Sequence, residues 1–249
     1  MKKIIVITGS EGTIGKSLSK FLYLKNFEVV NIDIKKIQKK NYFKCDINNE
    51  KQVKKTIKKI YRKYKKIDAL INAASYNPKQ TMIKSFKISD YSLVKWKKNT
   101  EVDIIGTFTL SKHVLRVFEQ QKFGTVINIS SNYGLVGPDQ DIYFKDKRPI
   151  FYGRKPIEYS MCKSATIGLT KGLAAFYKNT NIKILCLVFG GILEKHGNTF
   201  IKKYSDKTIL GRMINQGEYN EIIEFIIEKN THYLTGSIID CSGGSLSIL

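Results

Sequence analysis

The stretch Lys2-Lys-Ile-Ile-Val-Ile-Thr8, followed directly by Gly9-Ser-Glu-Gly-Thr-Ile-Gly15, decides the fold. Its first part is a short apolar run rich in β-branched residues, which is typical of a buried strand. Its second part is a glycine-rich turn. After the turn, apolar residues recur at helical spacing, namely Ile14, Leu18, Phe21 and Leu22. The chain therefore opens with a strand, a tight turn and a helix.

This turn has the features of a phosphate-binding loop. Its glycines permit positive φ and allow the backbone to approach a pyrophosphate, while the helix N-terminus supplies amide donors and a partial positive charge. We expect five of its residues to contact a dinucleotide: Gly9, Ser10, Gly12, Ile14 and Gly15.

The second strand, Glu28-Val-Val-Asn-Ile-Asp33, ends in a carboxylate 24 positions after Gly9. A spacing of ~20 is expected for a residue that accepts hydrogen bonds from the adenosine ribose. Asp33 would repel the 2′-phosphate of NADP, so NAD is the expected cofactor and NADP the less favoured one. The nearby Lys35 and Lys36 are the features that favour NADP.

Tyr159 and Lys163 are four residues apart in the helical stretch Glu158-Tyr-Ser-Met-Cys-Lys-Ser164, which places both on one helix face. A phenol ionises near pH ~10. A cation about 4 Å away, at an effective dielectric of ~20, is worth roughly 4 kcal/mol or about three pKa units. Such a tyrosine can exchange protons near neutral pH. The alternative interpretation is an exposed lysine beside a half-buried tyrosine.

Together these motifs resemble the short-chain dehydrogenase/reductase family, from Met1 nearly to the end of the chain. Further matches are Asp46 in Cys45-Asp-Ile47, the turn Asn72-Ala-Ala-Ser75, Ser131, and Thr235-Gly236 with Gly243-Gly244. The resemblance implies a Rossmann-like fold, with Ser131, Tyr159 and Lys163 as catalytic residues. It also implies cofactor contacts from Asp46, Ile47, Asn72, Ala73, Ala74, Tyr159, Lys163, Gly190 and Ile192.

Several positions depart from the family pattern: Thr13 replaces the usual second glycine of the turn, and the Asn72–Ser75 turn is altered. Phe189 replaces a proline after the sixth strand, and Glu194 replaces a threonine that contacts the cofactor. Asp103 stands where the family has an asparagine of the proton relay. We expect Asp103 to take a supporting catalytic role, with a charge that alters the site.

The pattern of apolar runs predicts one α/β domain over residues 1–249, a single doubly wound parallel sheet with helices on both faces. The predicted strands are residues 3–8, 28–33, 68–72, 125–130, 183–189 and 237–241. In the helix after Asp46, the apolar positions are Val53, Ile57, Ile60, Tyr64 and Ile67. That face is predicted to pack on the core, and the lysine-rich face to meet solvent.

The segment between Ser131 and Tyr159 spans 28 positions and is longer than in compact family members. We interpret residues 138–156 as a substrate-loop insertion. It interleaves cations with aromatic residues, a combination that suits a phosphorylated or nucleotide-linked sugar. Arg148, Arg154 and Tyr152 are the predicted substrate contacts. The insert resembles a branch of the family from surface-sugar and flagellin-modification pathways, and a surface loop or dimer contact is the alternative interpretation.

The composition limits the partners. The net charge is +22, but lysine supplies most of it, so specific nucleic-acid binding is not expected. The four cysteines and three histidines have no paired ligand spacing, so no metal is expected.

No apolar run reaches the ~18 residues of a membrane span, and the N-terminal residues lead directly into the cofactor turn. A cytoplasmic protein is expected.

The predicted function is an NAD(H)-dependent oxidoreductase that interconverts a secondary alcohol and a ketone on a sugar, sugar-phosphate or nucleotide-sugar derivative. The first alternative is a 3-oxoacyl thioester reductase. The second is a non-catalytic dinucleotide-sensing protein, suggested by Phe189, Asp103 and the altered Asn72–Ser75 turn. The family resemblance implies a homodimer or homotetramer.

Overall fold

The computed structural model describes residues 2–76, 87–145, 148–150, 153–229 and 231–248. Seven parallel strands form one sheet in the order β3-β2-β1-β4-β5-β8-β9. Their bounds are β1 Ile4–Thr8, β2 Glu28–Asp33, β3 Tyr42–Lys44, β4 Ala69–Asn72, β5 Gly124–Ser131, β8 Ile182–Phe189 and β9 Ile238–Cys241. The predicted α/β class and parallel sheet are confirmed.

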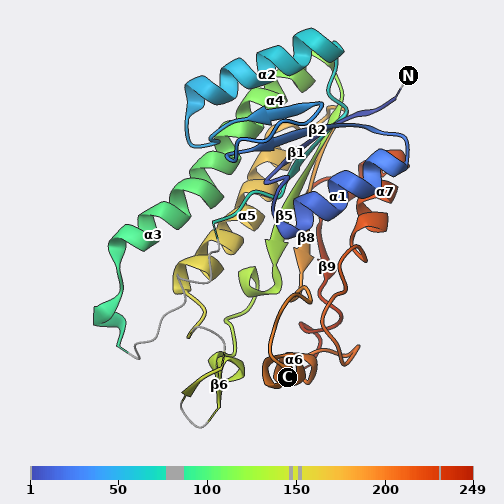
Figure 1. Cartoon of the computed structure of the whole chain (residues 1–249). Coiled ribbons are helices and arrows are strands. Elements are labelled where there is room, and N and C mark those ends of the chain that lie inside the picture. The colour runs from blue at the N-terminus through green and yellow to red at the C-terminus, as the bar shows by residue number, and fades with distance from the viewer. Residues whose placement is uncertain (1, 77–86, 146–147, 151–152, 230, 249) are drawn as a thin grey trace.

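Helices cover both faces of this sheet (Figure 1). On one face lie α2 Glu50–Tyr64, α4 Thr107–Gln121 and α5 Ile157–Phe176, and on the other lie α1 Thr13–Leu24 and α7 Asn220–Glu228. α3 Leu93–Thr100 continues through the π-helix Glu101–Gly106 into α4, and α6 Asn198–Ser205 lies beyond the sheet. Short 3-10 turns occur at Ile88–Asp90, Asn132–Gly134 and His232–Leu234.

The sheet strands are buried on both faces, as expected where helices pack on either side. β1, β4 and β8 consist entirely of buried residues. β8 pairs with β5 along its whole length, from Gly124 opposite Ile182 to Ser131 opposite Phe189. This register brings the end of β5 and the loop after β8 to the same edge of the sheet.

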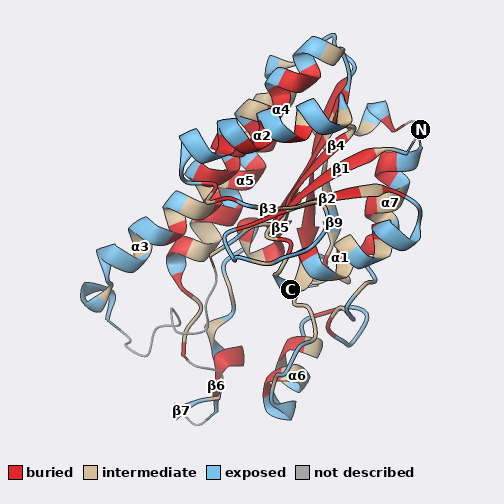
Figure 2. Cartoon of the chain, turned by 45° about the horizontal axis from the view of Figure 1, so that its top comes forward, coloured by how far each residue is buried: buried red, intermediate tan, exposed pale blue. Residues whose placement is uncertain are grey.

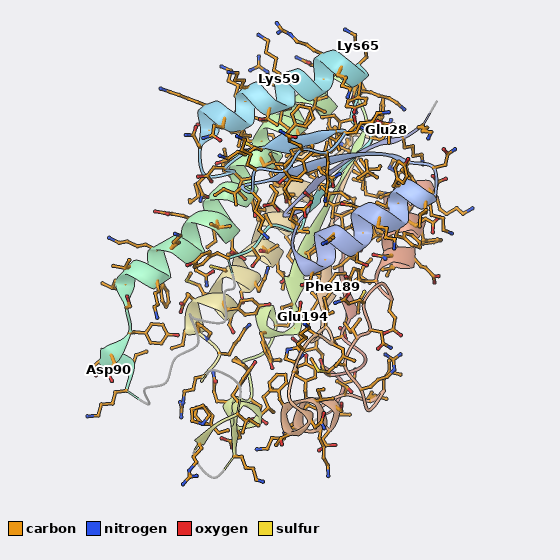
Figure 3. The ribbon with its side chains drawn as sticks, viewed as in Figure 1. Glu28, Lys59, Lys65, Asp90, Phe189 and Glu194 are labelled. Carbon is orange, nitrogen blue, oxygen red and sulfur yellow. The ribbon has the colours of Figure 1, made fainter. Side chains whose placement is uncertain are left out.

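Helix α2 shows how the lysine-rich sequence is accommodated. Val53, Ile57 and Ile60 are buried against the sheet, and Figure 2 shows α2 with both buried and exposed residues along its length. Lys59 and Lys65 are exposed and project outward (Figure 3). Its first turn is capped by the Asn49 side chain, which accepts a hydrogen bond of 3.0 Å from the Gln52 amide. The predicted division of this helix into core and solvent faces is confirmed.

Two features were not predicted. β3 pairs with β2 at the sheet edge, but two of its residues are half-buried, the third is exposed, and it lacks the apolar run that marks a buried strand. The insert contains a 3-10 turn, Gln140–Tyr143, and a small antiparallel pair, β6 Phe144–Lys145 with β7 Arg148–Pro149. Among the described residues, no helix is long and apolar enough to cross a membrane.

Candidate active site

A cavity of about 420 Å³ opens at the carboxyl ends of β1, β4, β5 and β8. The chain order places β2 on one side of β1 and β4 on the other, and ligands bind at such switch points in open α/β sheets. Figure 3 shows Phe189 and Glu194 at this edge, where β8 ends. Predicted site residues that line the cavity are Gly12, Ile14, Ala73, Ser131, Tyr159, Lys163, Gly190 and Ile192.

The glycine turn brings the N-terminus of α1 to the cavity. Gly9 has φ +61°, and a Cβ there would lie 2.7 Å from Ala74 Cα. A Cβ on Gly15 would lie 2.3 Å from the Gly9 carbonyl oxygen. Only glycine therefore permits this approach of helix, turn and the loop after β4. The Ser10 hydroxyl is buried and has no hydrogen-bond partner among the described residues, which fits a donor reserved for a phosphate.

The predicted adenosine-side residues lie along the same edge, outside the cavity lining. Asp33 ends β2 and is buried, with one carboxylate oxygen accepting from the Glu11 amide at 2.9 Å and the other from the Lys35 amide at 3.1 Å. These bonds hold the carboxylate beside the glycine turn. Asp46 accepts from the Asn48 amide at 3.0 Å, and Ile47 is buried, close to Gly106.

The Asn72 side chain points into the core. Its side-chain amide donates to Ser111 Oγ at 2.9 Å and to Asn128 Oδ1 at 2.8 Å, both inside the core. The side chain thus belongs to a buried polar network between β4, β5 and α4. It joins neighbouring elements and does not line the cavity.

Lys163 and Asp103 form a buried ion pair near Tyr159. The Lys163 ammonium lies 3.4 Å from Asp103 Oδ1 and 5.7 Å from the centre of the Tyr159 ring. Burial lowers the pKa of Lys163, but the Asp103 carboxylate and the Tyr159 phenol outweigh that effect and leave it raised. Lys163 therefore carries a charge at neutral pH, and its nearest anionic partner is Asp103.

Asp103 also organises the loop after β4. Its two carboxylate oxygens accept from Ser75 Oγ at 2.5 Å and from the Tyr76 amide at 2.7 Å. The aspartate thus fixes Lys163 on one side and the loop on the other. This supports a positioning role through Lys163.

Ser131, the last residue of β5, lines the same cavity as Tyr159. Its hydroxyl donates to Asn132 Oδ1 at 3.1 Å and accepts from the Tyr133 amide at 3.3 Å. The Ser131 hydroxyl is thus oriented by the 3-10 turn that directly follows it.

The insert delivers a different cation from those predicted. Lys155 lines the cavity, and its ammonium lies 3.6 Å from the centre of the Tyr159 ring. Arg148 is exposed on β7 and Arg154 lies against Phe144, with 5.8 Å from its guanidinium carbon to the ring centre. Neither arginine is among the described residues that line the cavity, and Tyr152 falls outside the described residues.

Lys155 had a sequence signal that the prediction did not use. It precedes Tyr159 by four positions, as Lys163 follows it by four. Burial lowers the pKa of Lys155 to about 7, the Lys163 ammonium acts in the same direction, and Asp103 opposes them.

An aromatic wall completes the substrate side of the cavity. Tyr143 of the insert packs against Phe200 of α6, with 5.4 Å between ring centres. The Tyr204 hydroxyl accepts from the Gly191 amide and from Asn132 Nδ2. Burial raises the pKa of Tyr133 and Tyr143, so both phenols stay neutral. Tyr143 belongs to the predicted insert, whereas Phe200 and Tyr204 come from α6, a distant segment that no local motif linked to the site.

A family model described as short chain dehydrogenase matches residues 3–144 of the chain. The chain belongs to the short-chain dehydrogenase family. Members of this family are oxidoreductases that use a nicotinamide nucleotide, which agrees with the glycine turn and with the Ser131, Tyr159 and Lys163 set. The inferred family and the expectation of an enzyme are confirmed.

Several relatives of this short-chain dehydrogenase are similar over almost its whole length. The post-translational flagellin modification protein A of Campylobacter coli is 26% identical, covering 97% of each chain. A 3-oxoacyl-(acyl-carrier-protein) reductase of Aquifex aeolicus is 25% identical, covering 96% of this chain and 86% of the reductase.

Solved structures show the same fold. A short-chain dehydrogenase from Leptospira borgpetersenii, determined with bound NAD+, has a TM-score of 0.85 and 28% identity, covering 98% of this chain and 93% of that chain. ElxO with NADP bound has a TM-score of 0.83 and 24% identity over the whole of both chains, a likeness of fold alone.

Proposed function

We propose that this short-chain dehydrogenase catalyses the NAD(H)-linked interconversion of a secondary alcohol and a ketone on a small polar substrate, with a sugar derivative as the leading candidate. The observation that carries the proposal is that Ser131, Tyr159 and Lys163 line one cavity together with the N-terminus of α1. Proton transfer and cofactor binding thus share one site.

The chain's own residues account for the polar part of the reaction. Tyr159 donates a proton to the carbonyl oxygen in reduction and removes it in oxidation. Ser131 hydrogen-bonds the same oxygen and polarises it. Lys163 stays charged beside Tyr159 because Asp103 balances it, and it can hold the nicotinamide ribose. The bound nicotinamide supplies or accepts the hydride.

Asp33 supports NAD over NADP. Its carboxylate is held at the end of β2 by two backbone amides, where it can accept from ribose hydroxyls and repel a 2′-phosphate. The side chain that follows it is the apolar Ile34.

The aromatic wall and the full-length similarity to a flagellin modification protein favour a sugar derivative as substrate. The second candidate is a 3-oxoacyl thioester, favoured by the similarity to 3-oxoacyl-(acyl-carrier-protein) reductases. We do not propose the sensing function, because the catalytic set lines a single cavity.

The test is a turnover screen that follows NADH oxidation with a panel of keto-sugars, keto acids and 3-oxoacyl thioesters. We expect turnover with a polar keto compound and little with the thioesters. Turnover confined to the thioesters would reverse the substrate assignment, and no turnover with any compound would contradict the function.

Assembly and compartment belong to the same proposal. Large apolar side chains on α3 to α5 are exposed, including Val94, Ile105 and Phe108, and we propose a homodimer or homotetramer that covers part of this surface. The four cysteines are all free, which fits a reducing compartment such as the cytoplasm. Sedimentation velocity measures the oligomeric state. Fractionation of cells shows the compartment.

A further inference from the structure

Asn132 links Ser131 to the aromatic wall of the cavity. It follows Ser131 directly in the chain, is buried, and lines the same cavity. Its side-chain oxygen accepts from the Ser131 hydroxyl at 3.1 Å. Its side-chain nitrogen donates to Ser245 Oγ at 3.1 Å and to the Tyr204 hydroxyl at 3.4 Å. One amide group therefore contacts three hydroxyls, which come from the end of β5, the segment after β9 and α6.

The Tyr204 hydroxyl is also held by the loop after β8. The Gly191 amide donates to it, and a Cβ on Gly191 would lie 2.6 Å from Tyr204 Cζ. The glycine thus makes room for the tyrosine ring. Burial raises the pKa of Tyr204, so its hydroxyl keeps its proton and can donate as well as accept.

Helix α6, which carries Tyr204, is fastened to the insert. Lys203 donates to the carbonyls of Asp141 and Phe144 at 3.0 and 2.6 Å. Tyr204, Phe200 and Phe144 are buried in one cluster. Figures 1 and 2 both place β6 and α6 at the same end of the molecule. The wall partner of Asn132 therefore stands on a packed support.

The direction of the hydrogen bonds seen in the structure takes up the Ser131 proton. A hydroxyl has one proton to donate and two lone pairs that accept. Ser131 accepts from the Tyr133 amide at 3.3 Å and donates its proton to Asn132. In this direction the proton is not available to a carbonyl oxygen in the cavity.

The same contacts permit the opposite direction. A carboxamide has a donor at one end and an acceptor at the other, and turning it end for end exchanges the two. Ser245 and Tyr204 would then donate to the Asn132 oxygen, while the Asn132 nitrogen donates to Ser131. The backbone amides that donate to Ser131 and Tyr204 keep their bonds. Ser131 then accepts two hydrogen bonds, and its own proton is left for the cavity.

We propose that Asn132 is a positioning residue, whose side-chain nitrogen donates to Ser131 during the reaction and thereby directs the serine proton at the carbonyl oxygen. The inference rests on the proposed function, because it takes Ser131 as a donor to that oxygen. Tyr204 and Ser245 contribute by donating to the Asn132 oxygen, so the wall built by α6 acts on the serine through one amide.

Two substitutions separate the direction of the network from its structure. Asn132→Asp keeps all three contacts, because a carboxylate can accept from each hydroxyl, but it holds the Ser131 proton away from the cavity. Asn132→Leu removes the three contacts and leaves the serine proton free to turn. Asn179→Asp is the matched control, at an exposed asparagine beyond the end of α5. Thermal melting confirms that each variant folds.

Kinetics with the fastest keto compound of the screen give the first test. We expect Asn132→Asp to lower kcat by 10²–10³-fold, the usual cost of losing one donor to the reacting oxygen. Asn132→Leu should lower kcat less, and Asn179→Asp should match the wild type. A structural role predicts the reverse order, since only the leucine variant loses the hydrogen bonds. A larger loss in Asn132→Leu than in Asn132→Asp would therefore overturn the proposal.

A double substitution separates the direction of the network from the new charge. The Ser131→Ala variant has no serine proton to misdirect, so adding Asn132→Asp to it should lower kcat by less than about threefold. An equal loss in the Ser131→Ala variant and in the wild type would show that the carboxylate acts on the site directly, and would overturn the proposal.

Binding without turnover separates this inference from the function on which it rests. Isobutyramide has a carbonyl oxygen that accepts hydrogen bonds and is not reduced, and its titration into the NADH complex is followed by fluorescence. Asn132→Asp and Ser131→Ala should each bind it about threefold or more weakly than the wild type, with Asn132→Leu affected less.

This binding pattern without turnover of any keto compound supports the positioning role and removes the redox function. Turnover with equal kcat in the wild type and Asn132→Asp overturns the positioning role and leaves the function intact. A wild type that neither binds isobutyramide nor reduces any keto compound contradicts both.

Discussion

Tyr159 lies close to two lysines with different electrostatic surroundings. Lys163 is paired with Asp103 and keeps a raised pKa, whereas burial and Lys163 lower the pKa of Lys155 to about 7. One lysine is thus a fixed charge and the other changes its protonation near neutral pH. The tyrosine faces the cavity in the field of both.

Substitution of the tyrosine tests its role as the acid and base. Tyr159→Phe should lower kcat by 10²–10⁴-fold, the usual contribution of general acid and base catalysis, because only the proton donor is lost. NADH affinity should stay within a few-fold, as measured by fluorescence titration. Tyr23→Phe is the control, since Tyr23 is 71% exposed. Retention of more than about a tenth of kcat would falsify the assignment.

Substitution of Asp33 tests cofactor choice. The wild type should bind NADH more tightly than NADPH, and Asp33→Ala should narrow the difference by about tenfold or more, because it removes both the ribose hydrogen bond and the repulsion of the phosphate. Parallel titrations with the two cofactors measure this, with the exposed Asp206→Ala as control. Tighter NADPH binding by the wild type contradicts the prediction.

At the scale of elements, the insert is the part that the sequence described least completely. Its position, its cations and its aromatic residues were predicted from the spacing of Ser131 and Tyr159. The choice of Lys155 over the arginines depends on Gln140 and on contacts with α6, which lies about 60 positions further along the chain. Contacts between residues so far apart in the chain produce no local pattern in the sequence, so they could not be predicted from it.

The fastening of the insert to α6 can be tested by hydrogen exchange. Lys203→Met removes both hydrogen bonds to the carbonyls of Asp141 and Phe144, each of which is charge-assisted. A loss of 1.5–3 kcal/mol would raise exchange in residues 139–145 by about tenfold or more. Mass spectrometry of peptides from this segment measures the effect, with the exposed Lys202→Met as control. Unchanged protection in Lys203→Met would show that other contacts hold the insert.

At the scale of the whole molecule, the parallel sheet was predictable because its strands are continuous apolar runs separated by amphipathic helices. The site residues at the glycine turn, β5 and α5 were predictable because each lies in a short motif at a strand end or on one helix face. β3 was not predicted, because an edge strand of three residues has no run of apolar residues. The core hydrogen bonds of Asn72 were not predictable, because a buried asparagine and a ligand-binding one look alike in sequence.

The central claim is that hydride transfer and proton transfer from Tyr159 occur in the cavity at the switch point of the sheet. The most direct measurement follows deuterium from NADH deuterated at both C4 positions into the alcohol product by mass spectrometry, using the fastest keto compound of the screen. We predict one deuterium per product molecule in the wild type and in Tyr23→Phe, and formation at least about 100-fold slower in Tyr159→Phe. Product without deuterium, equal rates in Tyr159→Phe and the wild type, or no product from any keto compound would contradict the account.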